Sequence, residues 1–155
     1  VELVIVGEGF ERDLIVDAIA QHHAQDWVQL AGRVTDEELR SLYRKAWVAT
    51  SASIREGWGM TLTEAAACGT PTVATNISGH ADAVEVGRSG LLASTDEELI
   101  RTMTQVLTDS PLRAKLQQGA LDRASELTWE HAAIANFEVL AQNARSRRSS
   151  RQRKP

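Results

Sequence analysis

Two glutamates, Glu56 and Glu64, flank a glycine-rich loop near the middle of the chain, which reads Gly57-Trp58-Gly59 directly after Glu56. Carboxylates accept hydrogen bonds from hydroxyl groups, and unpaired backbone N–H groups bind oxygen-rich anions. Two carboxylates beside free amides could hold a sugar hydroxyl, a ribose and a phosphate together. These residue types therefore predict a ligand that is rich in hydroxyl and phosphate oxygens.

The alanine-rich segment that follows the loop is expected to form a helix that ends at Gly69, with Pro71 just beyond. The glycines before it permit backbone conformations that a Cβ forbids. The loop should therefore lead into a helix N-terminus, where unpaired N–H groups and a partial positive charge attract phosphate. Residues 72–75 then read as a short buried strand. Strand, glycine loop, helix and strand form the unit of nucleotide-binding α/β folds.

Glu64 also has a purely structural interpretation. Thr61-Leu62-Thr63-Glu64 matches a capping box, in which a threonine and a glutamate three residues later satisfy the first amides of a helix. The residues alone leave both interpretations open, with the capping role slightly ahead.

Strand-like and helix-like segments alternate along the whole chain. Strands are expected at 2–6, 27–31, 47–51, 72–75 and 91–93, and helices at 10–23, 36–45, 81–86, 95–107, from 110 and from 128 to 144. Thr-Asp-Glu-Glu at 35–38 and again at 95–98 predicts a capping box at the start of a helix, and Ser110 before Pro111 predicts an N-cap. This alternation predicts a Rossmann-like α/β fold, a parallel sheet with helices on both faces, over a single domain of residues 1–144. In such sheets ligands bind at the carboxyl ends of the strands, where Gly7, Gly9 and Gly57–Gly59 fall. Gly7-Glu8-Gly9 lacks the third glycine of a dinucleotide fingerprint, so a tight turn is the favoured interpretation there.

The composition is that of a soluble globular protein. With 155 residues, 43% hydrophobic and 25% charged, the chain has the length of one domain. It has no apolar run of about 18 residues and no leader sequence, so we expect a cytoplasmic protein. Cys68 is the only cysteine, which rules out an intrachain disulfide. Because Val1 leads at once into an apolar strand, we expect a fragment that lacks a preceding partner strand.

The net charge of −4 conceals a division between body and tail. Residues 145–155 contain six basic side chains and no acid, so the residues before them carry about −10. Arginine and serine without apolar residues cannot form a core, which predicts a disordered tail. A solvated end is the favoured interpretation, and weak contact with an anionic membrane surface is the alternative.

Other candidate residues carry weaker signals. His80 follows Gly79 near a strand end, where it could face a ligand or lie in a surface loop. The other histidines, His22, His23 and His131, stand at helical positions without metal-ligand partners. The tryptophans Trp27, Trp47 and Trp129 each begin an apolar element and are expected in the core.

The central motif resembles that of a known enzyme family. Glu56 and Glu64, with Gly57-Trp58-Gly59 between them and Ala65-Ala66-Ala67-Cys68-Gly69-Thr70-Pro71 after them, are similar to the Glu-x₇-Glu signature of the group 1 retaining GT-B glycosyltransferases. Residues 3–9, 30–34 and 87–92 resemble further parts of that family in order and spacing. The resemblance covers about residues 1–144 and implies the carboxyl-terminal, donor-binding domain of a two-domain enzyme.

The resemblance also implies roles for individual residues. Glu56 would contact the donor sugar near its anomeric carbon and is the candidate catalytic residue, and Glu64 would bind the ribose. The amides of Gly57, Trp58 and Gly59 would hold sugar hydroxyls, and Met60 and Thr61 would lie against the diphosphate. Arg33 and Val34 would lie along the base, and Gly7 and Gly9 would belong to the same donor site. The diphosphate charge would be stabilised by the helix N-terminus, without a metal or other cofactor.

The family usually carries an Arg and a Lys that grip the diphosphate, and these would precede Val1, as would the amino-terminal domain that holds the acceptor. We therefore expect the donor-binding portion of a retaining hexosyltransferase, weak in nucleotide binding and inactive by itself. One alternative is a non-catalytic module for nucleotide sugars or sugar phosphates on the same fold. The other is a nucleic-acid or anionic-surface binder that acts through the tail, although specific nucleic-acid binding is not expected. The base, the sugar, the acceptor and the linkage stay open.

Overall fold

The computed structural model describes the backbone of residues 1–152 and the side chains of residues 1–146. It separates into two compact units, one of residues Val1–Ala46 and one that begins at Trp47. The sequence predicted one domain with one sheet, whereas the five strands form two sheets, β1-β2 and β3-β4-β5.

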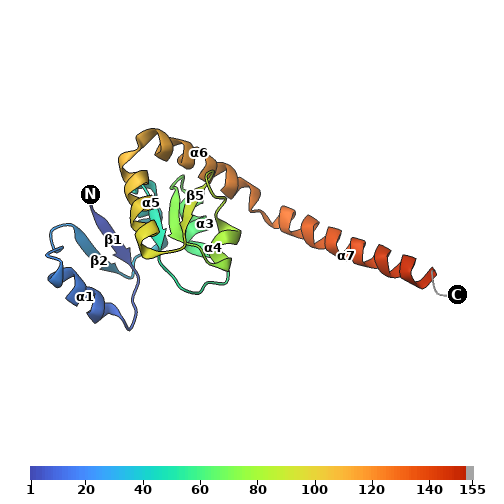
Figure 1. Ribbon diagram of the computed structural model, residues 1–155, viewed down its shortest axis with the longest axis horizontal. Helices are drawn as coiled ribbons and strands as arrows, with labels where there is room; N and C mark the ends of the chain where they lie inside the picture. Colours follow the sequence, from blue (N-terminus) through green and yellow to red (C-terminus); the bar gives the residue numbers. More distant parts are fainter. Residues whose placement is uncertain (153–155) are drawn as a thin grey trace. The chain divides into compact units, whose positions relative to one another are not determined.

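The first unit is a short parallel α/β element. It consists of β1 (Leu3–Val6), α1 (Arg12–Gln21), β2 (Val28–Gly32) and α2 (Asp36–Lys45) (Figure 1). The two strands pair in parallel from Leu3 beside Val28 to Val6 beside Gly32. Ala24 is the only buried hydrophobic residue of this unit. Its core is therefore thin, because a two-stranded sheet with few helices offers little surface for burial.

The second unit holds the larger sheet. It consists of β3 (Ala49–Ser51), α3 (Met60–Ala67), β4 (Thr72–Thr75), α4 (Ser78–Ala83), β5 (Gly90–Ala93), α5 (Asp96–Thr108), α6 (Ser110–Glu126) and α7 (Trp129–Gln152). β4 lies in the middle and pairs in parallel with β3 and with β5. The three strands are drawn in cyan to yellow-green in Figure 1, next to α3, α4 and α5.

Helices cover both faces of this sheet. Val73 of β4 packs with Val106 of α5 and Leu116 of α6. The next residue, Ala74, packs with Leu62 of α3 and Ala83 of α4. Because successive side chains of a strand point to opposite faces, these two clusters lie on opposite sides of β4. The predicted fold class, a parallel α/β sheet with helices on both faces, is confirmed.

The starts of α2 and α5 follow the caps that the sequence predicts, whereas the start of α6 does not. Thr35 and Glu38 form the expected capping box of α2, and Thr95 caps α5. For α6 the sequence favoured Ser110 as the cap, but Asp109 holds that position and accepts a hydrogen bond from the Leu112 N–H at 2.9 Å. The side chain of Asp109 reaches the free amides first, and Ser110 and Pro111 become the first helical residues.

The three tryptophans that the sequence places in the core lie outside it. Trp27, Trp47 and Trp129 are 47%, 55% and 92% exposed, so that expectation was wrong. Each stands just before or at the first residue of its element, where the chain has not yet entered the packed interior. Trp47 instead makes a cation–π contact with Arg113, whose guanidinium carbon Cζ lies 4.4 Å from the centroid of the Trp47 ring.

The disorder that the sequence predicts for residues 145–155 stays a prediction, since the structure describes only part of this segment. Helix α7 continues past Arg145 to Gln152, and residues 153–155 lie outside the described part of the chain. Arginine, glutamine and alanine favour helix, and no glycine or proline interrupts the segment before Pro155. An already formed helix can therefore propagate into a segment that has no core of its own. None of the described helices is both long and apolar enough to cross a membrane.

Candidate functional site

Helix α3 begins without a side-chain cap. Gly59 is its N-cap residue and has a left-handed backbone (φ 78°, ψ 52°), which glycine adopts at little cost. The N–H groups of Leu62 and Thr63 lie 3.0 and 3.4 Å from the Gly59 carbonyl oxygen. Within the described chain, the backbone N–H groups of residues 57–61 have no hydrogen-bond acceptor. The amides around the start of α3 thus have no partner within the described chain, and those of the exposed residues 57, 58, 60 and 61 are available to an anion.

These amides lie at the surface of the unit. Trp58 and Met60 are 38% and 62% exposed, and Gly57 and Thr61 are exposed as well. Gly59 alone of the five residues is buried. A ligand can therefore approach the start of α3 without first displacing packed side chains of the core.

Glu64 does not cap α3. A capping box would require Thr61 to precede the helix, but α3 already starts at Met60, and the Thr63 hydroxyl donates to the Met60 carbonyl at 2.8 Å. The Glu64 side chain is exposed and has no hydrogen bond or ion pair to any described residue. The capping interpretation was therefore wrong, and this carboxylate is free for another role.

Glu56 stands at the other side of the same helix start. Its side chain is exposed, and its Oε1 accepts a hydrogen bond from the Ser53 hydroxyl at 3.0 Å. Ser53 follows β3 by two residues, so the end of that strand orients the carboxylate. One oriented carboxylate thus precedes the unpaired amides of residues 57–61 in the chain, and one unpaired carboxylate follows them.

The last residue of β4 and the helix α4 contact the loop that contains Glu56. Thr75 donates its hydroxyl hydrogen to the Ser53 carbonyl oxygen at 2.5 Å. A Cβ added to Gly79 would stand 2.5 Å from the Glu56 carbonyl oxygen, so only glycine allows this close approach. His80 is fully buried next to Gly59, which decides against a surface-loop histidine.

Sequence reasoning missed Ser53, Thr75 and Gly79 as parts of the site. Ser53 and Thr75 are 22 residues apart, and nothing in their local sequence predicts that their groups meet. The one available signal was that both residues stand at the carboxyl ends of neighbouring parallel strands, where ligand sites gather.

The other predicted donor-binding residues belong to the first unit. Gly7 follows β1 with φ 119°, and its N–H donates to the Gly32 carbonyl at 2.8 Å. Arg33 and Val34 follow β2. Since β1 and β2 are parallel, Gly7, Gly9, Arg33 and Val34 gather at the carboxyl edge of that sheet. The predicted residues thus form two groups, one in each unit.

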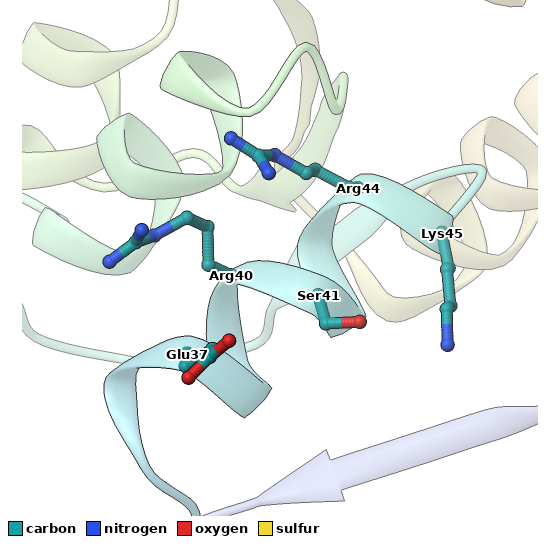
Figure 2. A pocket seen from close by; sticks show the side chains of 5 residues that line it. All are labelled: Glu37, Arg40, Ser41, Arg44 and Lys45. Carbon is teal, nitrogen blue, oxygen red and sulfur yellow. The ribbon is translucent and has the colours of Figure 1, made fainter.

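A hollow of about 420 Å³ runs along α2 and is lined by Glu37, Arg40, Ser41, Arg44 and Lys45 (Figure 2). All five side chains come from one helix at helical spacing, and Arg40 and Arg44 extend to the same side in the figure. We interpret it as the solvated charged face of an amphipathic helix. Among the described residues, no cluster of three or more His, Cys, Asp or Glu could hold a metal ion.

A parallel sheet with a glycine loop and an uncapped helix N-terminus is the arrangement by which α/β proteins bind the phosphates of nucleotides. The chain belongs to the family of glycosyl transferases group 1, whose family model matches residues 1–123. It is 41% identical over 98 residues to a D-inositol 3-phosphate glycosyltransferase of Stackebrandtia nassauensis, an alignment that covers 62% of this chain and 22% of that protein.

Solved structures agree in fold. Sucrose-phosphate synthase from Thermosynechococcus elongatus superposes with a TM-score of 0.77 at 25% identity, covering 94% of this chain and 39% of that one. The Anabaena protein HepE, solved with UDP and glucose, superposes with a TM-score of 0.76 at 23% identity, covering 89% of this chain and 40% of that one. The chain therefore matches GT-B glycosyltransferases over part of their length, about two fifths for these two structures.

Proposed function

We propose that this chain is the donor-binding portion of a retaining glycosyltransferase that transfers a hexose from a nucleotide diphosphate sugar to an acceptor. The observation that carries the proposal is the row of free N–H groups at residues 57–61 between the carboxylates of Glu56 and Glu64. Amides at a helix N-terminus suit a diphosphate, and carboxylates suit hydroxyl groups. Membership in the glycosyltransferase family supports a sugar nucleotide as the ligand that combines the two.

In the proposed complex each group has one task. The amides of Gly57, Trp58 and Gly59 donate to sugar hydroxyls, and the start of α3 at Met60 and Thr61 meets the diphosphate. Glu64, which no side chain of the described part engages, accepts from the ribose hydroxyls. That Arg33 and Val34 lie along the base, and that Gly7 and Gly9 belong to the donor site, remain predictions from the sequence.

Glu56 lies beside the anomeric carbon in this proposal. The acceptor oxygen bonds to that carbon as the bond from carbon to the diphosphate oxygen breaks, and the acceptor proton passes to the leaving phosphate. Negative charge grows on the diphosphate, where the helix N-terminus stabilises it. No protein nucleophile takes part, and attack from the same face retains the anomeric configuration. That no metal assists is a prediction, as are the cytoplasmic location and the contact of the basic tail with an anionic membrane.

The first experiment titrates UDP, GDP and ADP into the ¹⁵N-labelled chain. We expect the amide resonances of residues 57–61 and of Glu64 to move with one of these nucleotides. Shifts confined to residues 145–155 would instead support an anionic-surface or nucleic-acid binder, whose affinity falls steeply with salt.

The second experiment replaces Glu56 by Ala in the full-length protein and measures transfer from the donor that the titration identifies. Loss of a group beside the reacting centre should lower turnover by about 10²- to 10³-fold. Unchanged turnover would favour the alternative, a non-catalytic nucleotide-sugar binding module.

A further inference from the structure

His80 is a buried imidazole that packing alone does not explain. The residue belongs to α4 and is 0% exposed. Its Nδ1 lies 2.8 Å from the Thr75 carbonyl oxygen, and because a carbonyl only accepts, Nδ1 carries the ring hydrogen and donates. The other ring nitrogen, Nε2, is buried without a hydrogen-bond partner in the described chain. A buried unpaired polar atom destabilises a fold, so a leucine here would serve packing better.

The ring packs directly against the start of α3. Its Cδ2, the carbon bonded to Nε2, would lie 3.1 Å from a Cβ built on Gly59, tighter than most real Cβ contacts. Gly59 is the N-cap residue, and the free amides of residues 57–61 surround it. The imidazole therefore packs against the backbone at Gly59, next to the residues that carry these amides.

A second set of contacts leads from the same ring to Glu56. The Thr75 hydroxyl lies 3.2 Å from Nδ1 and donates its own hydrogen to the Ser53 carbonyl oxygen. The Ser53 hydroxyl in turn donates to Glu56 Oε1 at 3.0 Å. A chain of contacts through Thr75 and Ser53 thus joins the ring to the carboxylate.

We propose that His80 is a positioning residue of the donor site, which holds Gly59 at the start of α3 and, through Thr75 and Ser53, orients Glu56. The inference rests on the proposed function for its ligand, a nucleotide diphosphate sugar, and on the contacts above for everything else. The contact of the ring with Gly59 and the contacts through Thr75 and Ser53 to Glu56, here called the two branches, have different consequences. The contact with Gly59 affects binding of the diphosphate, whereas the branch to Glu56 affects binding of the sugar.

Three variants separate these branches. His80→Leu removes the ring that contacts Gly59 and Thr75, and His80→Asn keeps an N–H donor near the place of Nδ1. Ser53→Ala breaks the contact with Glu56, together with the hydrogen bond that the Ser53 hydroxyl accepts from the Ser51 hydroxyl, and leaves the contacts of the ring with Gly59 and Thr75 in place. Ser78→Ala, at an exposed position of α4, is the matched control. Calorimetric titration with UDP and UDP-glucose, or with GDP and GDP-mannose if the wild-type chain binds that pair, measures the affinities, and thermal melting measures the stability.

We expect His80→Leu to weaken both ligands about 10-fold or more while the melting temperature stays equal or rises. His80→Asn should keep affinities within about 3-fold of wild type, and Ser53→Ala should weaken the sugar nucleotide about 10-fold without changing the bare nucleotide. A role in stability alone would give the reverse, a lower melting temperature in His80→Leu with unchanged affinities, and would overturn the proposal.

A measurement without ligand keeps the inference testable if no nucleotide binds. NMR of the labelled imidazole should show the Nδ1–H tautomer, protected from exchange with water, and His80→Leu should move the amide resonances of residues 57–61. An Nε2–H tautomer, or unmoved amides in His80→Leu, would refute the positioning role. Absence of nucleotide binding by the wild-type chain would refute the proposed function instead.

Discussion

The Cα of Gly79 approaches the backbone of Glu56 so closely that a Cβ on Gly79 would stand 2.5 Å from the Glu56 carbonyl oxygen. Two elements far apart in the sequence, the loop after β3 and the helix α4, meet at this point. The position of the loop at Glu56 and Gly57 therefore depends on a buried glycine of α4.

Gly79→Ala should push the backbone of Glu56 and Gly57 away from α4. A backbone atom cannot yield as a side chain can, so we expect a loss of stability of about 1–3 kcal/mol and weaker binding of the nucleotide sugar. Denaturant unfolding and calorimetric titration measure the two effects. Ala81→Ser, at an exposed position of the same helix, is the control. Wild-type affinity in Gly79→Ala would show that the loop position is irrelevant to binding.

Glu64 and Glu38 form a matched pair of helix glutamates. Glu38 completes a capping box, in which its Oε2 accepts from the Thr35 N–H at 2.8 Å, whereas Glu64 has no side-chain partner in the described chain. We expect Glu38→Ala to lower the free energy of unfolding, because the hydrogen bond to the Thr35 N–H is lost. Glu64→Ala should change it by less than about 0.5 kcal/mol.

The same two variants should behave oppositely toward ligand. Glu64→Ala should weaken nucleotide binding, and Glu38→Ala should leave it near the wild-type value. A large stability loss in Glu64→Ala with unchanged binding would restore the structural interpretation of this residue.

The ion pairs of Glu126 predict a pH dependence of stability. Its Oε1 lies 2.8 Å from Arg88 Nη2, and this hydrogen bond, with a smaller contribution from Arg123, holds the pKa of Glu126 below its ordinary value of 4.5. A carboxyl whose pKa is lower in the folded state stabilises the fold above its unfolded pKa. This contribution is lost as the pH falls through the folded pKa.

We therefore expect the denaturation midpoint to fall as the pH drops below about 4.5, and Glu126→Gln to make that decline shallower. Arg88→Gln, which removes the main partner and leaves the carboxyl, should have a similar effect. An equally steep decline in both variants would assign the acid sensitivity to other groups.

Gly119 of α6 lies against the Arg88 carbonyl oxygen, with no room for a Cβ. An alanine in a helix interior normally gains about 1 kcal/mol over glycine. Here the clash with a backbone atom should outweigh that gain, so Gly119→Ala is expected to destabilise the second unit by about 1–3 kcal/mol. Lys115→Ala, at an exposed position of α6, should stay within about 0.5 kcal/mol in the same denaturant assay. A stabilised Gly119→Ala would mean that the segment around Arg88 yields easily.

Much of the local structure was predictable because its causes are local. The capping box at Thr35 and Glu38 correctly places α2 at Asp36–Lys45, and the apolar segment at 72–75 correctly places β4. The position of the candidate site also followed from local pattern, since glycines before an alanine-rich helix lead to an open helix N-terminus. The continuation of α7 over residues 145–152 has no such local signal, because helix propagation depends on the helix that precedes it.

The sequence by itself determined the parallel α/β class, the helix that begins after Gly59 and the two carboxylates that flank this start. Only the tertiary structure decided that the strands form two sheets, that Glu64 is free and not a cap, and that His80, Thr75 and Ser53 stand behind Glu56. The physical reason is the separation in sequence over which each kind of interaction acts. Helix propensity, capping and strand alternation act between residues a few positions apart, whereas the contacts of Ser53, Gly79 and His80 join groups about 20 residues apart, which only the packing of α4 brings together.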